Sequence, residues 1–161
     1  MVGLGLLILR LTLAVTLVAH GAHELFGAFS GPGIGSGGLS RTAAQLAAAG
    51  LSPGLPLALL SAVIKFLGGL LLGCGLLTRW AAAAVLGLIG IEVWKMQLQW
   101  GYFLNWSVDP TRGHGIEYSA VLAGVLVCLI LTGPGEWSWD GWRDRSAAAR
   151  AAGRARLRQR T

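Results

Sequence analysis

Several ionisable side chains lie within or beside apolar stretches of this sequence, where a charge is costly and is paired or functional. They are Arg10, His20, His23, Glu24, Lys65, Glu92, Lys95 and Glu117. In such surroundings a carboxylate can exchange a proton with a ligand, and a lysine or histidine can donate a hydrogen bond to a carbonyl group. The sequence holds no nucleophile elbow, phosphate-binding loop, haem-attachment motif or Cys-x-x-Cys pair. We therefore predict no catalytic residues and no intrinsic cofactor.

The composition is that of a membrane protein. Of the 161 residues, 54% are hydrophobic and 12% are charged, whereas an average soluble domain has about 25% charged residues. The high content of Leu, Ile and Val excludes a disordered chain, and a total of two cysteines excludes a disulfide scaffold. We therefore expect one integral membrane domain of about four spanning helices, each of roughly 20 residues.

Four apolar stretches predict the helices that position the ionisable side chains: residues 4–26, 55–77, 80–99 and 116–132. The third is weaker than the others, and we expect it to insert as a hairpin with the second. In the glycine-rich loop between the first two, Thr42 and Gln45 have the spacing of a capping box, which predicts a short helix over 42–49. The predicted fold is all-α, a four-helix membrane bundle over 1–142 followed by an Arg- and Ala-rich cytoplasmic tail over 143–161.

The distribution of basic residues predicts the orientation. Four spans put both termini on one side of the membrane, and this side carries Arg79 and the seven arginines between 143 and 160. The opposite side carries only Arg41 and Arg112. Because cytoplasmic loops are enriched in Lys and Arg, we expect both termini to be cytoplasmic.

Helical depth and periodicity predict one polar cluster in the outer half of the membrane. At about 1.5 Å per residue, Lys65 lies near mid-bilayer. Its helix face also carries Ser61, Gly69 and Gly73, the small residues of a close helix contact, so we expect Lys65 to point into the bundle. The predicted cluster contains His20, Glu24, Lys65, Glu92 and Glu117.

Two interpretations of this cluster remain open. One is a salt-bridge network that fixes the register of the helices, in which Glu92 also pairs with Lys95 three residues later. The other is a site that binds a ligand or exchanges protons. A metal site is disfavoured, because His20 and His23 have no further strong ligands nearby.

The basic tail also has two interpretations. Its candidate partner-binding residues are Arg150, Arg154, Arg156, Arg158 and Arg160. These arginines can anchor the chain to anionic membrane lipids, or they can dock an acidic cytoplasmic partner. Nucleic acid is disfavoured as a partner, because no aromatic residues alternate with the arginines.

Short motifs along the chain resemble those of one family. Residues 20–27 read HGAHELFG, residues 68–79 read GGLLLGCGLLTR, and residues 101–105 read GYFLN. Glu117-Tyr118 and the sequence GPG at 133–135, followed by Ser138 and Asp140, complete the set. With Arg10 in the first helix, these motifs over residues 4–140 resemble the DoxX family in their order and spacing.

The resemblance implies a four-helix bundle in the bacterial cytoplasmic membrane, in a family whose namesake members are the small membrane subunit of thiosulfate:quinone oxidoreductase. This chain departs from the family pattern at three positions. The family usually has a lysine at position 24 and an acidic residue at 65, and commonly a histidine at 97, where this chain has Glu24, Lys65 and Gln97. The exchanged charges predict that Glu24 and Lys65 attract each other.

The resemblance therefore implies a subunit of a redox or energy-converting membrane complex, in contact with quinone or bound lipid and with other membrane subunits. Such a chain is not a complete enzyme by itself. The alternative is a non-catalytic structural or assembly subunit that stabilises a larger membrane complex. A small transporter is disfavoured, because the sequence shows no inverted repeat.

Overall fold

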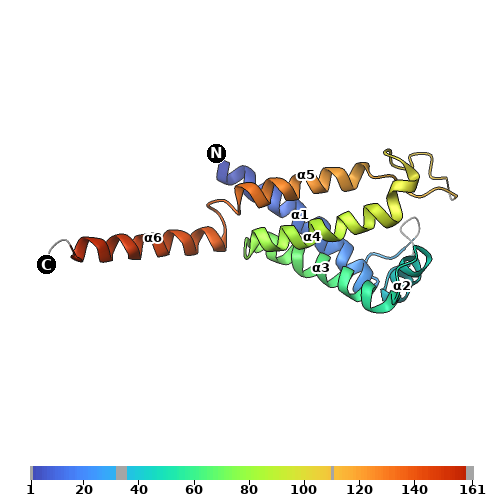
Figure 1. Cartoon of the computed structure of the whole chain (residues 1–161), viewed down its shortest axis with the longest axis horizontal. Helices are drawn as coiled ribbons and strands as arrows, with labels where there is room; N and C mark the ends of the chain where they lie inside the picture. Colours follow the sequence, from blue (N-terminus) through green and yellow to red (C-terminus); the bar gives the residue numbers. More distant parts are fainter. Residues whose placement is uncertain (1, 32–35, 110, 159–161) are drawn as a thin grey trace.

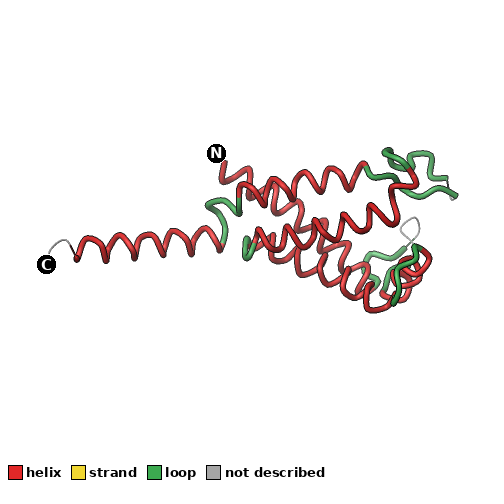
Figure 2. Tube along the Cα trace, in the orientation of Figure 1, coloured by secondary structure: helices red, strands yellow, loops and turns green. Residues whose placement is uncertain are grey.

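The computed structural model describes residues 2–31, 36–109 and 111–158 (Figures 1 and 2). Every element in these ranges is a helix: α1 (Val2–Phe26), α2 (Leu39–Ala48), α3 (Gly54–Cys74), α4 (Thr78–Glu92), the π-helical turn η1 (Val93–Gln97), the 3-10 turn η2 (Leu98–Trp100), α5 (Glu117–Thr132) and α6 (Trp139–Arg158). Helices α1, α3, α4 and α5 lie side by side. Helix α2 covers one end of this bundle, and α6 extends from the other (Figure 1). The all-α class is confirmed.

Three helical segments of the described chain are long and apolar enough to cross a membrane: α1 with 25 residues, α3 with 21, and the continuous helix Thr78–Trp100 with 23. Helix α5 is also apolar but has 16 residues. These elements coincide with the four apolar stretches of the sequence. The first residues of α1 and the start of α6 lie at the same end of the bundle (Figure 1).

Glycines bring α1 and α3 into close contact. A Cβ atom on Gly69 would lie 2.9 Å from the backbone nitrogen of Val18, and one on Gly73 would lie 3.1 Å from the Cβ of Ala14. On α1, a Cβ on Gly21 would lie 2.5 Å from the backbone nitrogen of Phe66. The prediction that the small-residue face of α3 packs against a neighbouring helix is confirmed.

The apolar core lies where α1, α3, α4 and α5 converge. Its fully or nearly fully buried side chains include Leu13, Leu17, Leu72, Val85, Leu126 and Leu129. This core fills the part of the bundle nearer α6, and polar side chains lie in the part nearer α2. It is therefore the apolar packing that separates the candidate site from the α6 end of the molecule.

Arg10 joins three segments at the α6 end of the bundle. Its side chain is 1% exposed. Nη1 donates a hydrogen bond to the carbonyl of Pro134 (2.5 Å), and Nη2 donates to the carbonyls of Trp137 (2.9 Å) and Gly73 (3.3 Å). A single guanidinium therefore ties α1 to the end of α3 and to the linker between α5 and α6.

The short helix in the first loop begins earlier than its sequence predicts. Helix α2 starts at Leu39, three residues before the expected start, and Gly38 before it has φ 103°. Because Thr42 lies inside the helix, its hydroxyl donates to the carbonyl of Gly38 (3.3 Å) instead of capping a helix start. The predicted capping box of Thr42 and Gln45 is wrong, because the positive φ of Gly38 lets the chain turn into the helix one turn sooner.

Candidate functional site

Lys65 lies between two glutamates from neighbouring helices. Its Nζ atom on α3 is 2.5 Å from Oε1 of Glu24 on α1 and 2.6 Å from Oε1 of Glu92 at the end of α4. Ser61, one turn before Lys65, has its hydroxyl within hydrogen-bond distance of Oε2 of Glu24 (3.2 Å) and Oε1 of Glu92 (3.3 Å). The predicted attraction between Glu24 and Lys65 is confirmed, and we call Glu24, Lys65 and Glu92 the charge triad.

The charge triad faces the inside of the bundle. The side chains of Lys65, Glu24 and Glu92 are 13%, 15% and 21% exposed. With all three ionised, the triad carries one net negative charge in an environment that penalises charges. An additional proton or a hydrogen-bond donor is the kind of group that would lower this penalty.

A π-helical turn follows Glu92 and sets the direction of the next residues. Because η1 has a wider turn than an α-helix, Lys95 does not lie on the face of Glu92. Instead its Nζ atom lies 4.2 Å from the ring centroid of Trp94. The predicted Glu92–Lys95 pair is therefore wrong, and Lys65 takes the place of Lys95.

A polar cavity of about 390 Å³ lies on one side of the charge triad, under α2. Its lining includes the triad, Ser61, Thr42 and Gln45 of α2, Gln97, Trp100 and His114. Carboxylates, an ammonium group, amides and an imidazole therefore surround one space. Such a lining can hold water and pass protons to and from the triad.

A second cavity, of about 380 Å³, lies between α1, α4 and α5. Leu17, Ile89 and Leu122 give it apolar walls. His20 and Tyr118, whose ring centroids are 6.3 Å apart, lie on its α1 and α5 sides, and both are exposed. Because α1 packs mainly against α3 and touches α5 sparsely, this cavity lies at a loosely packed seam of the bundle.

The two cavities share a wall. Lys65, Glu92, Gln97 and His114 line both of them. A molecule in the apolar cavity would therefore meet an ammonium group, a carboxylate, an amide and an imidazole at its polar end. The same four side chains would connect it to the polar cavity.

The loop before α5 fixes the tautomer of His114. The backbone N–H of Asn105 can only donate, and it lies 3.3 Å from Nδ1 of His114. Nδ1 must therefore accept this hydrogen bond, which leaves the proton of a neutral imidazole on Nε2. The buried Asn105 side chain also bonds the carbonyls of Asp109 (2.8 Å) and Arg112 (2.7 Å), so the loop that carries His114 is held on both sides.

Sequence reasoning missed His114, which lies outside the apolar stretches. Two glycines flank it, and a Cβ atom on Gly115 would lie 2.5 Å from the carbonyl oxygen of Phe103. This close approach turns the loop back over the bundle. The sequence feature that could have indicated His114 is a histidine between two glycines directly before an apolar helix.

The structure does not bring every predicted residue to the charge triad. Glu117 begins α5, and its carboxylate accepts a hydrogen bond from the backbone N–H of Leu104 (3.2 Å). Its place in the predicted cluster is therefore wrong, because the loop before α5 uses its carboxylate. His23 directs Nδ1 to the carbonyl of Ala28 (2.8 Å). His20 lines the apolar cavity without joining an ion pair.

The arginines predicted to bind a partner lie on α6 or beyond it. Arg150 and Arg154 are exposed on this helix. The side chains of Arg156 and Arg158 lie outside the described residues, as does the whole of Arg160. Helix α6 itself extends away from the bundle (Figure 1).

These features define a helical membrane protein with a partly buried charge triad beside two adjoining cavities. A family model described as DoxX matches residues 5–96, more than half of the chain. The chain belongs to the DoxX family, and the match includes all three residues of the charge triad. No curated protein and no solved structure matches the chain.

Proposed function

We propose that this DoxX-family protein is a subunit of a redox or energy-converting membrane complex and binds a quinone headgroup in the apolar cavity. The shared wall of the two cavities carries the proposal. The apolar walls suit the ring and tail of a membrane-soluble quinone, and Lys65 and His114 present N–H donors to a carbonyl oxygen.

The charge triad would exchange the protons of this reaction. Reduction of a quinone takes up two electrons and two protons, and Glu92 faces both the quinone cavity and the polar cavity. A proton from Glu92 can be replaced through the polar cavity without passing the apolar core. The electrons would come from a partner subunit, so the chain would not be a complete enzyme.

Binding of a short-chain ubiquinone to the purified full chain tests this proposal. We expect quenching of tryptophan fluorescence in detergent to report saturable binding. Thr16 lines the apolar cavity, so Thr16→Phe should fill it and lower the affinity by at least about tenfold. Thr12 lies one turn away on the same helix, and its hydroxyl bonds the carbonyl of Ile8. Thr12→Phe is therefore the matched control, and equal affinities of the two variants would refute the proposal.

We further propose that α5 is a fourth span, so that both termini lie on one side of the membrane. Because this side carries Arg79 and the arginines of α6, we propose that it is the cytoplasm of a bacterial cell. At about 1.5 Å per residue, its 16 residues measure roughly 24 Å, close to the hydrocarbon thickness of about 30 Å. A green fluorescent protein fused to the C-terminus should fluoresce, whereas alkaline phosphatase at the same position should be inactive. The reverse result would contradict this orientation.

A role in assembly is the second candidate, and the exposed arginines of α6 favour it. In this function α6 docks an acidic cytoplasmic partner while the bundle packs against other membrane subunits. Arg150→Glu with Arg154→Glu should then reduce the size of the native complex extracted from membranes. Arg41→Glu, on the exposed start of α2, is the matched control. An unchanged complex would exclude this function for the described part of α6.

A further inference from the structure

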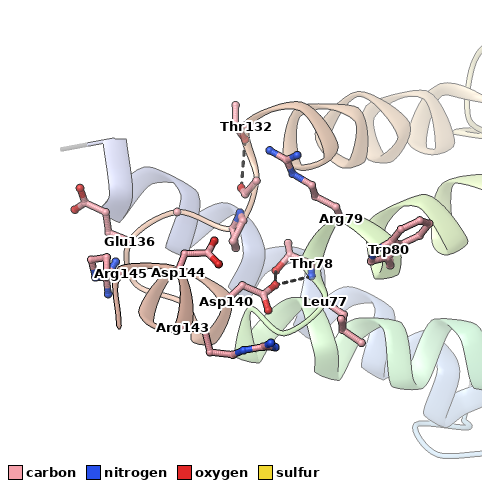
Figure 3. A pocket seen from close by; sticks show the side chains of 14 residues that line it. Leu77, Thr78, Arg79, Trp80, Thr132, Glu136, Asp140, Arg143, Asp144 and Arg145 are labelled. Carbon is pink, nitrogen blue, oxygen red and sulfur yellow. Dashed lines mark hydrogen bonds between the residues drawn. The ribbon is translucent and has the colours of Figure 1, made fainter. Parts of the chain in front are cut away.

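A further cavity lies at the α6 end of the bundle, far from the charge triad. It has a volume of about 620 Å³. Its walls come from the first turn of α4, the end of α5, the linker after α5 and the first turns of α6 (Figure 3). Neither proposed function uses this cavity.

Charged groups of both signs surround this cavity. The basic ones are Arg79, Arg143 and Arg145, and the acidic ones are Glu136, Asp140 and Asp144. In the described part of the chain, the ion pairs are those of Lys65 with Glu24 and Glu92. The charges at this cavity therefore balance in number without pairing with one another, an arrangement that suits a ligand carrying both signs.

Basic and acidic side chains lie around the same cavity, where one ligand can contact both. Arg79 lies beside the end of α5, and Arg143 lies on the opposite side of the cavity near Leu77 (Figure 3). Asp144 projects from α6 beside Asp140 in the same view. Asp140 is already engaged, because its carboxylate accepts hydrogen bonds from Thr78.

The cavity lies where apolar helices end, which in a membrane-spanning bundle is the level of the lipid headgroups. Arg79 is the second residue of α4 and Thr132 is the last residue of α5, so the apolar helices end here. Leu77 and Trp80 at the rim are 50% and 77% exposed. An exposed tryptophan beside the end of an apolar helix is typical of the membrane interface.

We propose that this cavity binds the headgroup of phosphatidylethanolamine. Arg79 would hold the phosphate, for which a guanidinium group offers two parallel N–H donors. Asp144 would accept hydrogen bonds from the ammonium group, and the acyl chains would follow Leu77 and Trp80 into the bilayer. This site lies apart from the charge triad, and it does not depend on quinone binding.

Native mass spectrometry of the full chain in detergent tests the proposal with three lipids of identical acyl chains. Phosphatidylethanolamine should be retained more strongly than phosphatidylglycerol, which lacks the ammonium group. It should also be retained more strongly than phosphatidylcholine, whose trimethylated nitrogen cannot donate N–H hydrogen bonds. Equal retention of phosphatidylethanolamine and either other lipid would overturn the proposal.

Two variants test the contacts to the ammonium group and to the phosphate separately. Asp144→Asn should lower retention of phosphatidylethanolamine about tenfold and leave that of phosphatidylglycerol unchanged. Arg79→Gln should lower retention of both lipids, because both contain the phosphate. Arg41→Gln at the opposite end of the bundle is the matched control and should change neither.

Thermal unfolding in lipid-free detergent shows whether the variants fold. Asp144 and Arg79 are exposed, so we expect transition temperatures close to that of the unmodified chain. A folded Asp144→Asn variant that retains phosphatidylethanolamine as strongly as the unmodified chain would overturn the proposal.

Discussion

The carboxylate of Asp140 accepts a hydrogen bond from the backbone N–H of Thr78, 3.0 Å away, although 62 residues separate the two in sequence. The residue before α4, Leu77, has a left-handed conformation (φ 48°) and provides no side-chain cap. The first turn of α6 therefore caps the start of α4. In return, the backbone N–H of Asp140 donates to the carbonyl of Gly75 (3.0 Å), so α6 is fixed to the turn between α3 and α4.

Removal of this cap should destabilise the bundle. We expect Asp140→Ala to lower the free energy of unfolding by about 1 kcal/mol, because the N–H groups at the start of α4 lose their acceptor. Asp140→Asn keeps an acceptor oxygen, so its free energy of unfolding should fall by less. Thermal unfolding in detergent, followed by circular dichroism, measures both effects. Equal stability of the alanine variant and the unmodified chain would show that α4 needs no cap.

The contact between α1 and α3 should tolerate no side chain at Gly21. Because an added Cβ atom would meet the backbone of Phe66, Gly21→Ala should cost about 1–3 kcal/mol of stability. Gly87 lies on α4 with no atom within 4 Å of an added Cβ, so Gly87→Ala should be neutral or gain about 0.5–1 kcal/mol. Chemical unfolding of the two variants side by side distinguishes packing from helix propensity, and an equal loss would contradict the close contact.

Exchange of the charges of Glu24 and Lys65 in a double variant should restore much of the stability that each single substitution removes. Glu24→Lys leaves two ammonium groups beside one carboxylate, and Lys65→Glu leaves three carboxylates together. Each single variant should lose about 3–5 kcal/mol, the loss expected when one partner of a buried ion pair is removed. The double variant again places an ammonium group beside two carboxylates. A double variant no more stable than the singles would rule out a direct attraction.

Lysine should not replace Arg10. The planar guanidinium serves three carbonyl groups from separate segments, and a single ammonium group cannot reach all three positions. Arg10→Lys should therefore cost about 2 kcal/mol, because at least one buried carbonyl loses its donor. Arg41→Lys on the exposed start of α2 is the control. Comparable melting temperatures for the two variants would refute the role of Arg10 as a clamp.

The loop that carries His114 should weaken in acid. Hydrogen bonds from the hydroxyl and backbone N–H of Thr111 lower the pKa of Asp109 below its ordinary value. A carboxyl group with a lowered pKa stabilises the folded loop above its unfolded pKa, and this contribution is lost as the pH falls through the folded value. Thr111→Val should raise the pKa of Asp109, as measured by carboxyl-carbon NMR. An unchanged pKa would mean that the hydroxyl bond does not form in solution.

The helices were predictable from regular spacing, and the central ion pair from the exchange of charges relative to the family pattern. Period and depth place Lys65 on the face of α3 that packs inward, and the exchanged charges pair it with Glu24. The same reasoning failed at Lys95 and Glu117. A π-helical turn rotates Lys95 away from Glu92, and the loop before α5 uses the carboxylate of Glu117, neither of which a helical repeat can reveal.

The contacts made by loops were not predictable for a different reason. His114 reaches both cavities only because Asn105 organises a loop that has no period. Asp140 and Thr78 meet across a long stretch of chain, and the sequence shows each of them only as a polar residue near the end of an apolar stretch. Loop closure over such distances depends on the packed bundle, which local patterns do not describe.

The attachment of α6 determines how far its arginines stand from the lipid surface. Helix α6 leaves the bundle along the long axis of the molecule (Figure 1), and Arg150 follows its first residue, Trp139, by eleven positions. At about 1.5 Å per residue, Arg150 stands roughly 17 Å beyond the start of the helix. A headgroup layer is only about 5–8 Å thick. With the bundle spanning the membrane as proposed, the first half of α6 is a spacer that holds Arg150 and Arg154 in water, beyond the headgroup layer.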